Sequence, residues 1–187
     1  EFPKSKPFAD SLTAQLVLKV GDNITTDHIM PAGAKILPYR SNIPYLSKFC
    51  FEVCDPTFPE RAKAAGNGII VGGSNYGQGS SREHAALVPM YLGIRGVIAK
   101  GFARIHIANL INSGILPMTF ENPEDYEKLD QDAKLTISNI IDGMKTGKLT
   151  VTADNGFTFR VNCDLTQRQQ AILLAGGLLN YTKEGGV

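Results

Sequence analysis

The stretch Gly68-Ile-Ile-Val-Gly-Gly-Ser-Asn-Tyr-Gly-Gln-Gly-Ser-Ser-Arg-Glu-His84 joins a short apolar run to a segment rich in glycine and serine. Residues 69–71 are predicted to form a buried strand and residues 82–92 a helix, so the segment between them is a strand-to-helix turn. Free backbone N–H groups converge at such a turn and favour an anion there. Two hydroxyls and a guanidinium, from residues 80–82, stand at the same point. The composition is that of a carboxylate or oxyanion site with a hydroxyl as candidate base.

Two common nucleotide-binding loops are excluded by the same stretch. A P-loop needs Lys followed by Ser or Thr where Gln78 and Gly79 stand. A dinucleotide fingerprint that starts at Gly77 needs Gly or Ala where Arg82 stands. On composition alone, a capped tight turn without a function and an anion site both stay open.

A second polar cluster, residues 21–33, follows an alternating apolar pattern at residues 16–20 that predicts a half-buried strand. Asp, Asn and Thr in such a loop typically satisfy nearby backbone N–H groups. Asp27 differs from the others, because it stands next to His28 and a carboxylate can orient or tune an imidazole. Further along, a loop bounded by prolines carries Arg40, which by itself indicates no more than a solvated cation.

Composition predicts one globular domain with a sizeable core. The chain has 187 residues, of which 43% are hydrophobic, and a net charge of +1, so no nucleic-acid surface is expected. Neither a membrane span nor a signal peptide is recognisable, and we expect a cytoplasmic or mitochondrial-matrix protein. The odd number of cysteines argues against a disulfide framework and favours buried thiols: Cys50, Cys54 and Cys163. Lys and Pro near the start predict a linker over residues 1–12 and a domain over residues 13–187, cut from a larger polypeptide or processed as a small subunit.

Strand and helix patterns alternate along the chain. The predicted strands are residues 15–20, 68–72, 95–99, 115–120, 134–138, 149–153 and 157–162, and the predicted helices are 82–92, 103–113, 123–130 and 166–181. Asp154-Asn-Gly156 is a strong hairpin signal between the last two strands. The alternation predicts an α/β fold, with a mixed sheet that carries helices on both faces.

Three segments together resemble the C-terminal swivelling domain of aconitase. They are residues 77–87, which contain Gly-Gln-Gly-Ser-Ser-Arg-Glu-His, residues 25–28, Thr-Thr-Asp-His, and residues 102–106, Phe-Ala-Arg-Ile-His. The similarity keeps the expected order from about residue 16 to about residue 181. The small subunit of isopropylmalate isomerase shares the Ser-Ser-Arg-Glu-His turn, whereas Thr-Thr-Asp-His-Ile and Leu-Pro-Tyr-Arg are more similar to aconitase. The resemblance implies the swivelling β/β/α domain of that family.

The resemblance also implies an activity. Aconitate hydratase is a hydro-lyase that isomerises citrate and isocitrate through cis-aconitate, and its 4Fe-4S cluster is held by three Cys of other domains. We therefore expect this chain to bind no cofactor itself and to work with cluster-binding domains of the same polypeptide or with a large subunit. The isolated chain is expected to be inactive. The expected ligands are tricarboxylates (citrate, isocitrate and cis-aconitate).

Roles for individual residues follow from the same resemblance. It makes Ser80 the proton-abstracting base and Asp27 a catalytic carboxylate. Substrate carboxylates are expected to bind Ser81, Arg82 and Arg40. The other polar residues of these motifs are expected to be structural: Glu83, His84, Arg104 and His106.

Two alternative functions stay open. One is the small subunit of an isopropylmalate or homoaconitate isomerase, which shares the chemistry and differs in the group that meets the variable arm of the substrate. An apolar arm would be poorly served by an exposed Arg40, because burying an unpaired guanidinium is costly, whereas a third carboxylate would pair with it. The other is a non-enzymatic module that binds anions or RNA, which the near-neutral charge disfavours.

Overall fold

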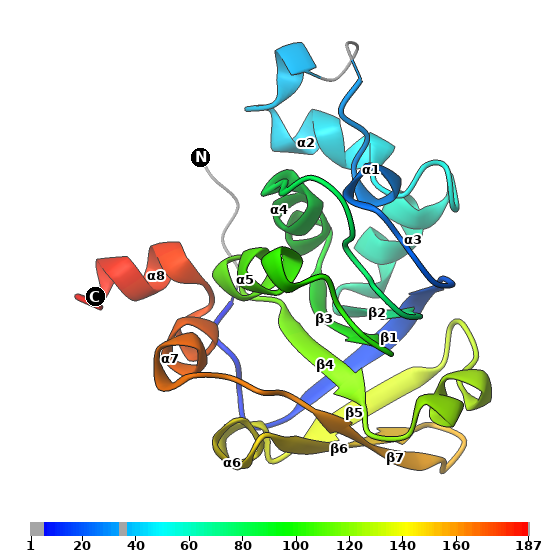
Figure 1. The fold of residues 1–187 in the computed structure, drawn as a ribbon, viewed down its shortest axis with the longest axis vertical. Coiled ribbons are helices and arrows are strands. Elements are labelled where there is room, and N and C mark those ends of the chain that lie inside the picture. The colour runs from blue at the N-terminus through cyan, green and yellow to red at the C-terminus, as the bar shows by residue number, and fades with distance from the viewer. Residues whose placement is uncertain (1–5, 34–36, 187) are drawn as a thin grey trace.

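Seven strands close into a barrel in the computed structural model, which describes residues 6–33 and 37–186 (Figure 1). The strands are β1 (Leu12–Lys19), β2 (Gly68–Gly72), β3 (Ile94–Ala99), β4 (Leu116–Phe120), β5 (Lys134–Ser138), β6 (Lys148–Ala153) and β7 (Thr158–Asn162). Their order around the barrel is β1-β2-β3-β4-β7-β6-β5. The strands β1 to β4 pair in parallel, and all other neighbours pair antiparallel. The predicted mixed α/β fold is confirmed, and closure of the sheet is the feature that the sequence pattern did not predict.

Helices lie against both the parallel and the antiparallel strands of the barrel. They are α1 (Thr26–Ile29), α2 (Ile43–Leu46), α3 (Phe58–Ala65), α4 (His84–Tyr91), α5 (Arg104–Asn112), α6 (Ile140–Thr146), α7 (Gln167–Ala175) and α8 (Leu178–Lys183), with 3-10 helices η1 (Leu37–Tyr39), η2 (Ser47–Phe49) and η3 (Pro123–Lys128). Figure 1 shows α1 to α4 together beyond the parallel strands, with the β6–β7 hairpin at the opposite end of the molecule. The residues between the parallel strands therefore build one end of the domain, and this end carries the polar motifs.

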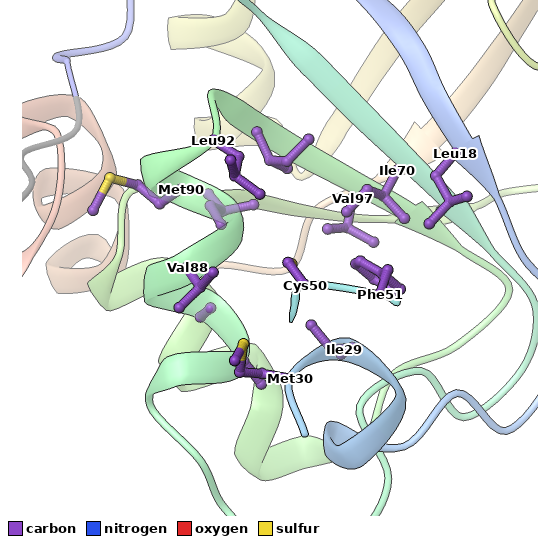
Figure 2. Packing of buried hydrophobic residues seen from close by; sticks show 14 of the residues in the cluster. Leu18, Ile29, Met30, Cys50, Phe51, Ile70, Val88, Met90, Leu92 and Val97 are labelled. Carbon is purple, nitrogen blue, oxygen red and sulfur yellow. The ribbon is translucent and has the colours of Figure 1, made fainter. Parts of the chain in front are cut away.

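The parallel strands bury both of their faces, because one side meets the helices and the other fills the barrel. Leu18 and Ile70 point toward Phe51 on the helical side (Figure 2). Their neighbours Ile69 and Val71 belong to the second core cluster, which contains residues of β5 to β7. This two-sided burial explains why residues 68–72 read as a continuous apolar run rather than an alternating one.

The predicted C-terminal helix over residues 166–181 is wrong in one respect, because it is two helices. The N-cap prediction is confirmed: Thr166 forms a capping box with Gln169. The helix ends at Ala175, since Gly176 and Gly177 take positive φ angles of 94° and 121°. A side chain at Gly177 would also place its Cβ 2.9 Å from the carbonyl oxygen of Asn112, so the chain turns where α7 meets α5.

Other helix predictions differ from the structure at their ends or in type. The predicted helix at residues 82–92 begins two residues later, at His84, which leaves Ser80–Arg82 outside it. The predicted helix at residues 123–130 is the 3-10 helix η3, and Asn122 caps it by accepting from the N–H of Glu124, as expected. Four short helices were not predicted: α1, α2, α3 and α6. Each has eight residues or fewer, which is too short for a clear helical period.

The segment before β1 also contacts the barrel. Phe8 is buried, and the guanidinium of Arg95 lies 4.3 Å from the centre of its ring. Arg95 also donates a 2.7 Å hydrogen bond to the carbonyl of Lys6. The division into a linker over residues 1–12 and a domain over residues 13–187 stays a prediction. No helix in residues 6–33 and 37–186 is long and apolar enough to cross a membrane.

Candidate functional site

The two polar clusters of the sequence lie against each other at the carboxyl end of β2. The N–H of Gly77 donates to the carbonyl of Ile24 at 2.7 Å, and the N–H of Thr26 donates to the carbonyl of Gln78 at 2.9 Å. The Thr26 hydroxyl then donates to the carbonyl of Ser80 at 2.9 Å. These bonds fasten the Gly-rich turn to the start of α1 and fix the place from which Ser80 projects.

Ser80 and Ser81 are both exposed at the end of this turn. The amide of Asn109 on α5 donates a long, 3.4 Å hydrogen bond to the Ser81 hydroxyl. Among residues 6–33 and 37–186, no hydrogen bond engages the Ser80 hydroxyl or the backbone N–H groups of Ser80, Ser81 and Arg82. The turn therefore presents hydroxyls and N–H donors together, in front of the N-terminus of α4.

Arg82 and Asp27 form an ion pair across the two clusters. The Arg82 side chain is 28% exposed and the Asp27 side chain 66%, so the pair stands at the surface and contributes little to stability. Its effect is geometric, because the carboxylate fixes the direction of the guanidinium. The two residues that the sequence assigned to catalysis and substrate binding are thus brought into direct contact.

His28 and His84 each hold a loop in place. The ring of His28 accepts from the N–H of Thr25 at 2.8 Å and completes a capping box that starts α1 beside Asp27. The ring of His84 donates from Nε2 to the carbonyl of Arg40 at 2.6 Å, which ties the Arg40 loop to the start of α4. This bond agrees with the structural role expected for His84, which stays a prediction.

A cavity of about 310 Å³ opens between the Arg40 loop and the turn, and we call it the Arg40 hollow. Residues of its wall include Met30, Leu46, His84, Arg40, Ser81 and Arg82. The three residues predicted to bind substrate carboxylates therefore line one cavity. Ser80 and Asp27 are not part of its lining and stand beside it, through their neighbours Ser81 and Arg82.

A second cavity of about 230 Å³ lies on the other side of Ser81, between the turn and α5, and we call it the His106 hollow. Sequence analysis assigned His106 a purely structural role and did not predict this cavity. The pairing of Tyr76 with Phe102, which brings α5 to the turn, cannot be recognised in the sequence. The sequence does show that His106 and Asn109 are three residues apart, and residues with this spacing share a face of a helix.

Metal ligands are not grouped in this part of the chain. Within residues 6–33 and 37–186, no group of three or more His, Cys, Asp and Glu side chains could hold a metal ion. Burial raises the pKa of the Cys50 thiol well above its usual value, and Cys163 lies elsewhere, in the barrel cluster, with a pKa of about 11. The described thiols are therefore not placed as a cluster-binding set.

Comparison with known proteins identifies the family. The family model of the aconitase C-terminal domain matches residues 51–123. The small subunit 2 of 3-isopropylmalate dehydratase from Archaeoglobus fulgidus is 38% identical over 169 residues, which cover 90% of this chain and 93% of that subunit. This chain belongs to the aconitase/isopropylmalate isomerase superfamily. The superfamily consists of hydro-lyases whose 4Fe-4S cluster is held by the large domain or subunit.

Further relatives agree with this assignment. The crystal structure of a 3-isopropylmalate dehydratase from Methanocaldococcus jannaschii superposes with a TM-score of 0.75 at 32% identity, covering 94% of this chain and 95% of the other. A probable mitochondrial aconitate hydratase of Dictyostelium discoideum is 37% identical over 95% of this chain. The chain spans only 27% of that hydratase. Sequence similarity thus extends to both 3-isopropylmalate dehydratases and aconitate hydratases.

Proposed function

We propose that this chain is the substrate-binding and base-supplying half of a hydro-lyase, and that it works as the small subunit of an isomerase of the isopropylmalate or homoaconitate type. The observation that carries the first part is the Arg40 hollow, whose wall joins two guanidinium groups and a serine next to Ser80. The second part is supported by the match to the A. fulgidus small subunit, which extends over 93% of its length. The proposed partner is a cluster-bearing large subunit.

In the proposed reaction, the Ser80 oxygen takes a proton from the carbon next to a substrate carboxylate. An alkoxide is unfavourable in water at neutral pH, so the site must stabilise negative charge at this oxygen. The backbone N–H groups at residues 80–82, the N-terminus of α4 and the Arg82 guanidinium provide this stabilisation. Loss of the substrate hydroxyl needs a Lewis acid, which the 4Fe-4S cluster of the family would supply when it is bound in the large domain or subunit.

Arg82 and Arg40 bind the substrate carboxylates in this proposal. A guanidinium can grip a carboxylate through two parallel hydrogen bonds, so its direction matters. Asp27 sets the direction of Arg82 through their ion pair and keeps it in place before the substrate arrives. In the same way, the bond between His84 and the Arg40 carbonyl sets the position of the loop that carries Arg40.

A second candidate function is the C-terminal domain of an aconitate hydratase. The observation that favours it over an isopropylmalate isomerase is the presence of Arg40 in the same hollow as Arg82, because the third carboxylate of citrate would pair with Arg40 and the alkyl arm of isopropylmalate would not. The similarity to the D. discoideum hydratase supports it as well.

Substrate preference separates the two candidates. The enzyme is assembled from this chain and its cluster-bearing part, and kcat/KM is measured for 3-isopropylmalate, homoaconitate and citrate. Preference for either of the first two supports the small-subunit function, and preference for citrate supports the second candidate. If none of the three is turned over by an assembly with an intact cluster, the hydro-lyase proposal itself is wrong.

A further inference from the structure

The His106 hollow is a cavity for which the proposed reaction has no use. Its wall is formed by the Gly-rich turn on one side and by the first turns of α5 on the other, with Thr26, Gly77, Gly79, Ser81, His106 and Asn109 among the lining residues. We propose that this hollow is a separate binding site for a small carboxylate. The site lies across Ser81 from the Arg40 hollow and goes beyond the proposed function.

His106 provides the first evidence for a ligand. Its side chain is 1% exposed, and neither ring nitrogen has a hydrogen-bond partner among residues 6–33 and 37–186. Leaving a buried polar group without a partner is costly, so such groups are normally satisfied by protein, water or ligand. His106 is one of the residues that line the hollow, so we place the missing partner in the space beside it.

The ring is held rigidly in this position. A Cβ atom at Gly77 would lie 2.3 Å from Cγ of His106, so the turn packs directly onto the imidazole. The Tyr76 ring lies 5.6 Å from it, centre to centre. Because burial lowers the pKa of His106 to about 4, the ring is neutral at pH 7 and offers one N–H to an acceptor. A fixed donor without a partner is a preorganised binding group.

The N-terminus of α5 is the second, independent feature. This nine-residue helix starts at Arg104, and its N-cap residue Ala103 has no side chain that could cap it. In the described part of the chain, no hydrogen bond occupies the N–H groups of Arg104 and Ile105, which line the hollow. Free N–H groups at a helix N-terminus favour a negative charge. The His106 ring and the N-terminus of α5 therefore both favour a hydrogen-bond acceptor, and the helix N-terminus also favours a negative charge.

The remaining lining residues define the class of anion. Arg104 contributes one cation, and Asn109 and Ser81 contribute neutral polar groups, while Asp and Glu are absent from the lining. A guanidinium can grip one carboxylate group through two parallel hydrogen bonds, so this lining suits a ligand that carries a carboxylate. A volume of about 230 Å³ accommodates a carboxylate with a few carbon atoms.

Binding is tested on the 15N-labelled chain by titration with succinate, followed through its amide resonances. We expect saturable shifts at Gly77, Gly79, Arg104, Ile105 and Asn109. Arg104→Gln is expected to weaken binding about tenfold, which corresponds to about 1.4 kcal/mol. Arg160→Gln, which removes an exposed charge from β7 far from the hollow, is the matched control and should leave the affinity unchanged.

His106→Phe tests the buried donor, since it keeps a planar ring and removes both nitrogens. It is expected to weaken succinate binding by tenfold or more, and its amide spectrum reports whether the fold is kept. If this variant does not fold, Arg104→Gln and Asn109→Leu decide, because Arg104 is exposed and Asn109 only half-buried. Unchanged affinity in these variants overturns the proposal, as do shifts confined to residues of the Arg40 hollow.

Two further titrations identify the ligand. Inorganic phosphate is expected to bind more weakly than succinate, and tighter binding of phosphate would overturn the carboxylate assignment. Citrate that binds once, with shifts in both hollows, indicates one ligand that spans Ser81, whereas succinate shifts at α5 alone indicate a separate ligand. The second result supports the separate site, and the first overturns it. No step of these tests needs turnover, so failure here is distinct from failure of the proposed function.

Discussion

Ser80 is the residue on which the proposed chemistry depends most. Ser80→Ala in the assembled enzyme removes the base but keeps the Thr26 bond, which goes to the Ser80 backbone carbonyl. We expect kcat to fall by roughly three orders of magnitude or more with little change in KM, since proton abstraction occurs only in the transition state. Steady-state kinetics measure this. A fall in kcat of less than about tenfold, near 1.4 kcal/mol, would leave Ser80 as a residue of the turn only.

Arg40 is the residue that distinguishes the two candidate substrates. Arg40→Lys keeps the charge and loses the planar fork, so a substrate carboxylate bound there loses part of a charge-assisted contact of roughly 1.5–3 kcal/mol. If a third carboxylate binds at Arg40, kcat/KM for citrate should fall markedly while that for 3-isopropylmalate stays constant. Equal values for citrate before and after the change would contradict the tricarboxylate assignment.

How much of the site could be predicted differs from residue to residue. The motif that contains Ser81 and Arg82 was recognisable because its residues stand next to each other in a run that is rare. The contact of Arg82 with Asp27 joins residues 55 positions apart, and no local pattern encodes it. The hollow beside His106 was not predicted for the same reason, because it exists only once the turn and α5 have packed together.

At the scale of elements, the break between α7 and α8 depends on backbone conformation. Gly177 has a φ of 121° and approaches the Asn112 carbonyl, so Gly177→Ala meets both conformational strain and a clash. We expect a loss of roughly 2 kcal/mol or more in the free energy of unfolding. Chemical denaturation measures it.

Two other glycines serve as controls for this prediction. Gly156→Ala meets the strain of a positive φ, 90°, without any atom within 4 Å of the new Cβ, and should cost less than Gly177→Ala. Gly21→Ala meets neither and should be close to neutral. If all three variants are equally stable, the close approach of α7 to α5 is not what ends the helix.

Strands were predicted better than helices for a physical reason. The strands of this barrel are bounded by turns and carry dense apolar runs, and every predicted strand is present within one to three residues at its ends. The missed helices α1 and α2 have four residues each and are held by side-chain caps and tertiary contacts rather than by an apolar period. Barrel closure depends on the pairing of β1 with β5, a contact between distant segments that no local pattern encodes.

At the scale of the whole molecule, the division of labour gives a direct prediction. The isolated chain should fold and show no turnover of citrate, cis-aconitate or 3-isopropylmalate, since its described residues group no metal-binding set. Circular dichroism verifies the fold and a coupled assay measures turnover. Addition of the cluster-bearing part should restore activity, and robust turnover by the chain alone would disprove the proposed division.

The buried His106 also links the stability of the whole fold to pH. Burial lowers its pKa from 6.5 to about 4 in the folded protein. As the pH falls below about 6.5, the His106 imidazole binds a proton in the unfolded chain but not in the folded chain. The free energy of unfolding therefore decreases with falling pH until about pH 4. A difference of this size corresponds to roughly 3 kcal/mol. Urea denaturation between pH 7 and pH 4 measures the slope.

The contribution of one histidine is isolated by comparing two variants. His106→Gln removes the titrating ring, so its unfolding free energy should depend less steeply on pH between 6.5 and 4 than that of the unmodified chain. His84→Gln keeps His106 and should keep the steep dependence, even if loss of the bond to the Arg40 carbonyl lowers stability at every pH. Carboxylates such as Asp55, whose pKa is lowered through hydrogen bonds with Thr57 and Arg61, titrate alike in all three proteins and cancel in the difference. Parallel pH profiles for His106→Gln and the unmodified chain would mean that the imidazole is not buried in its neutral form.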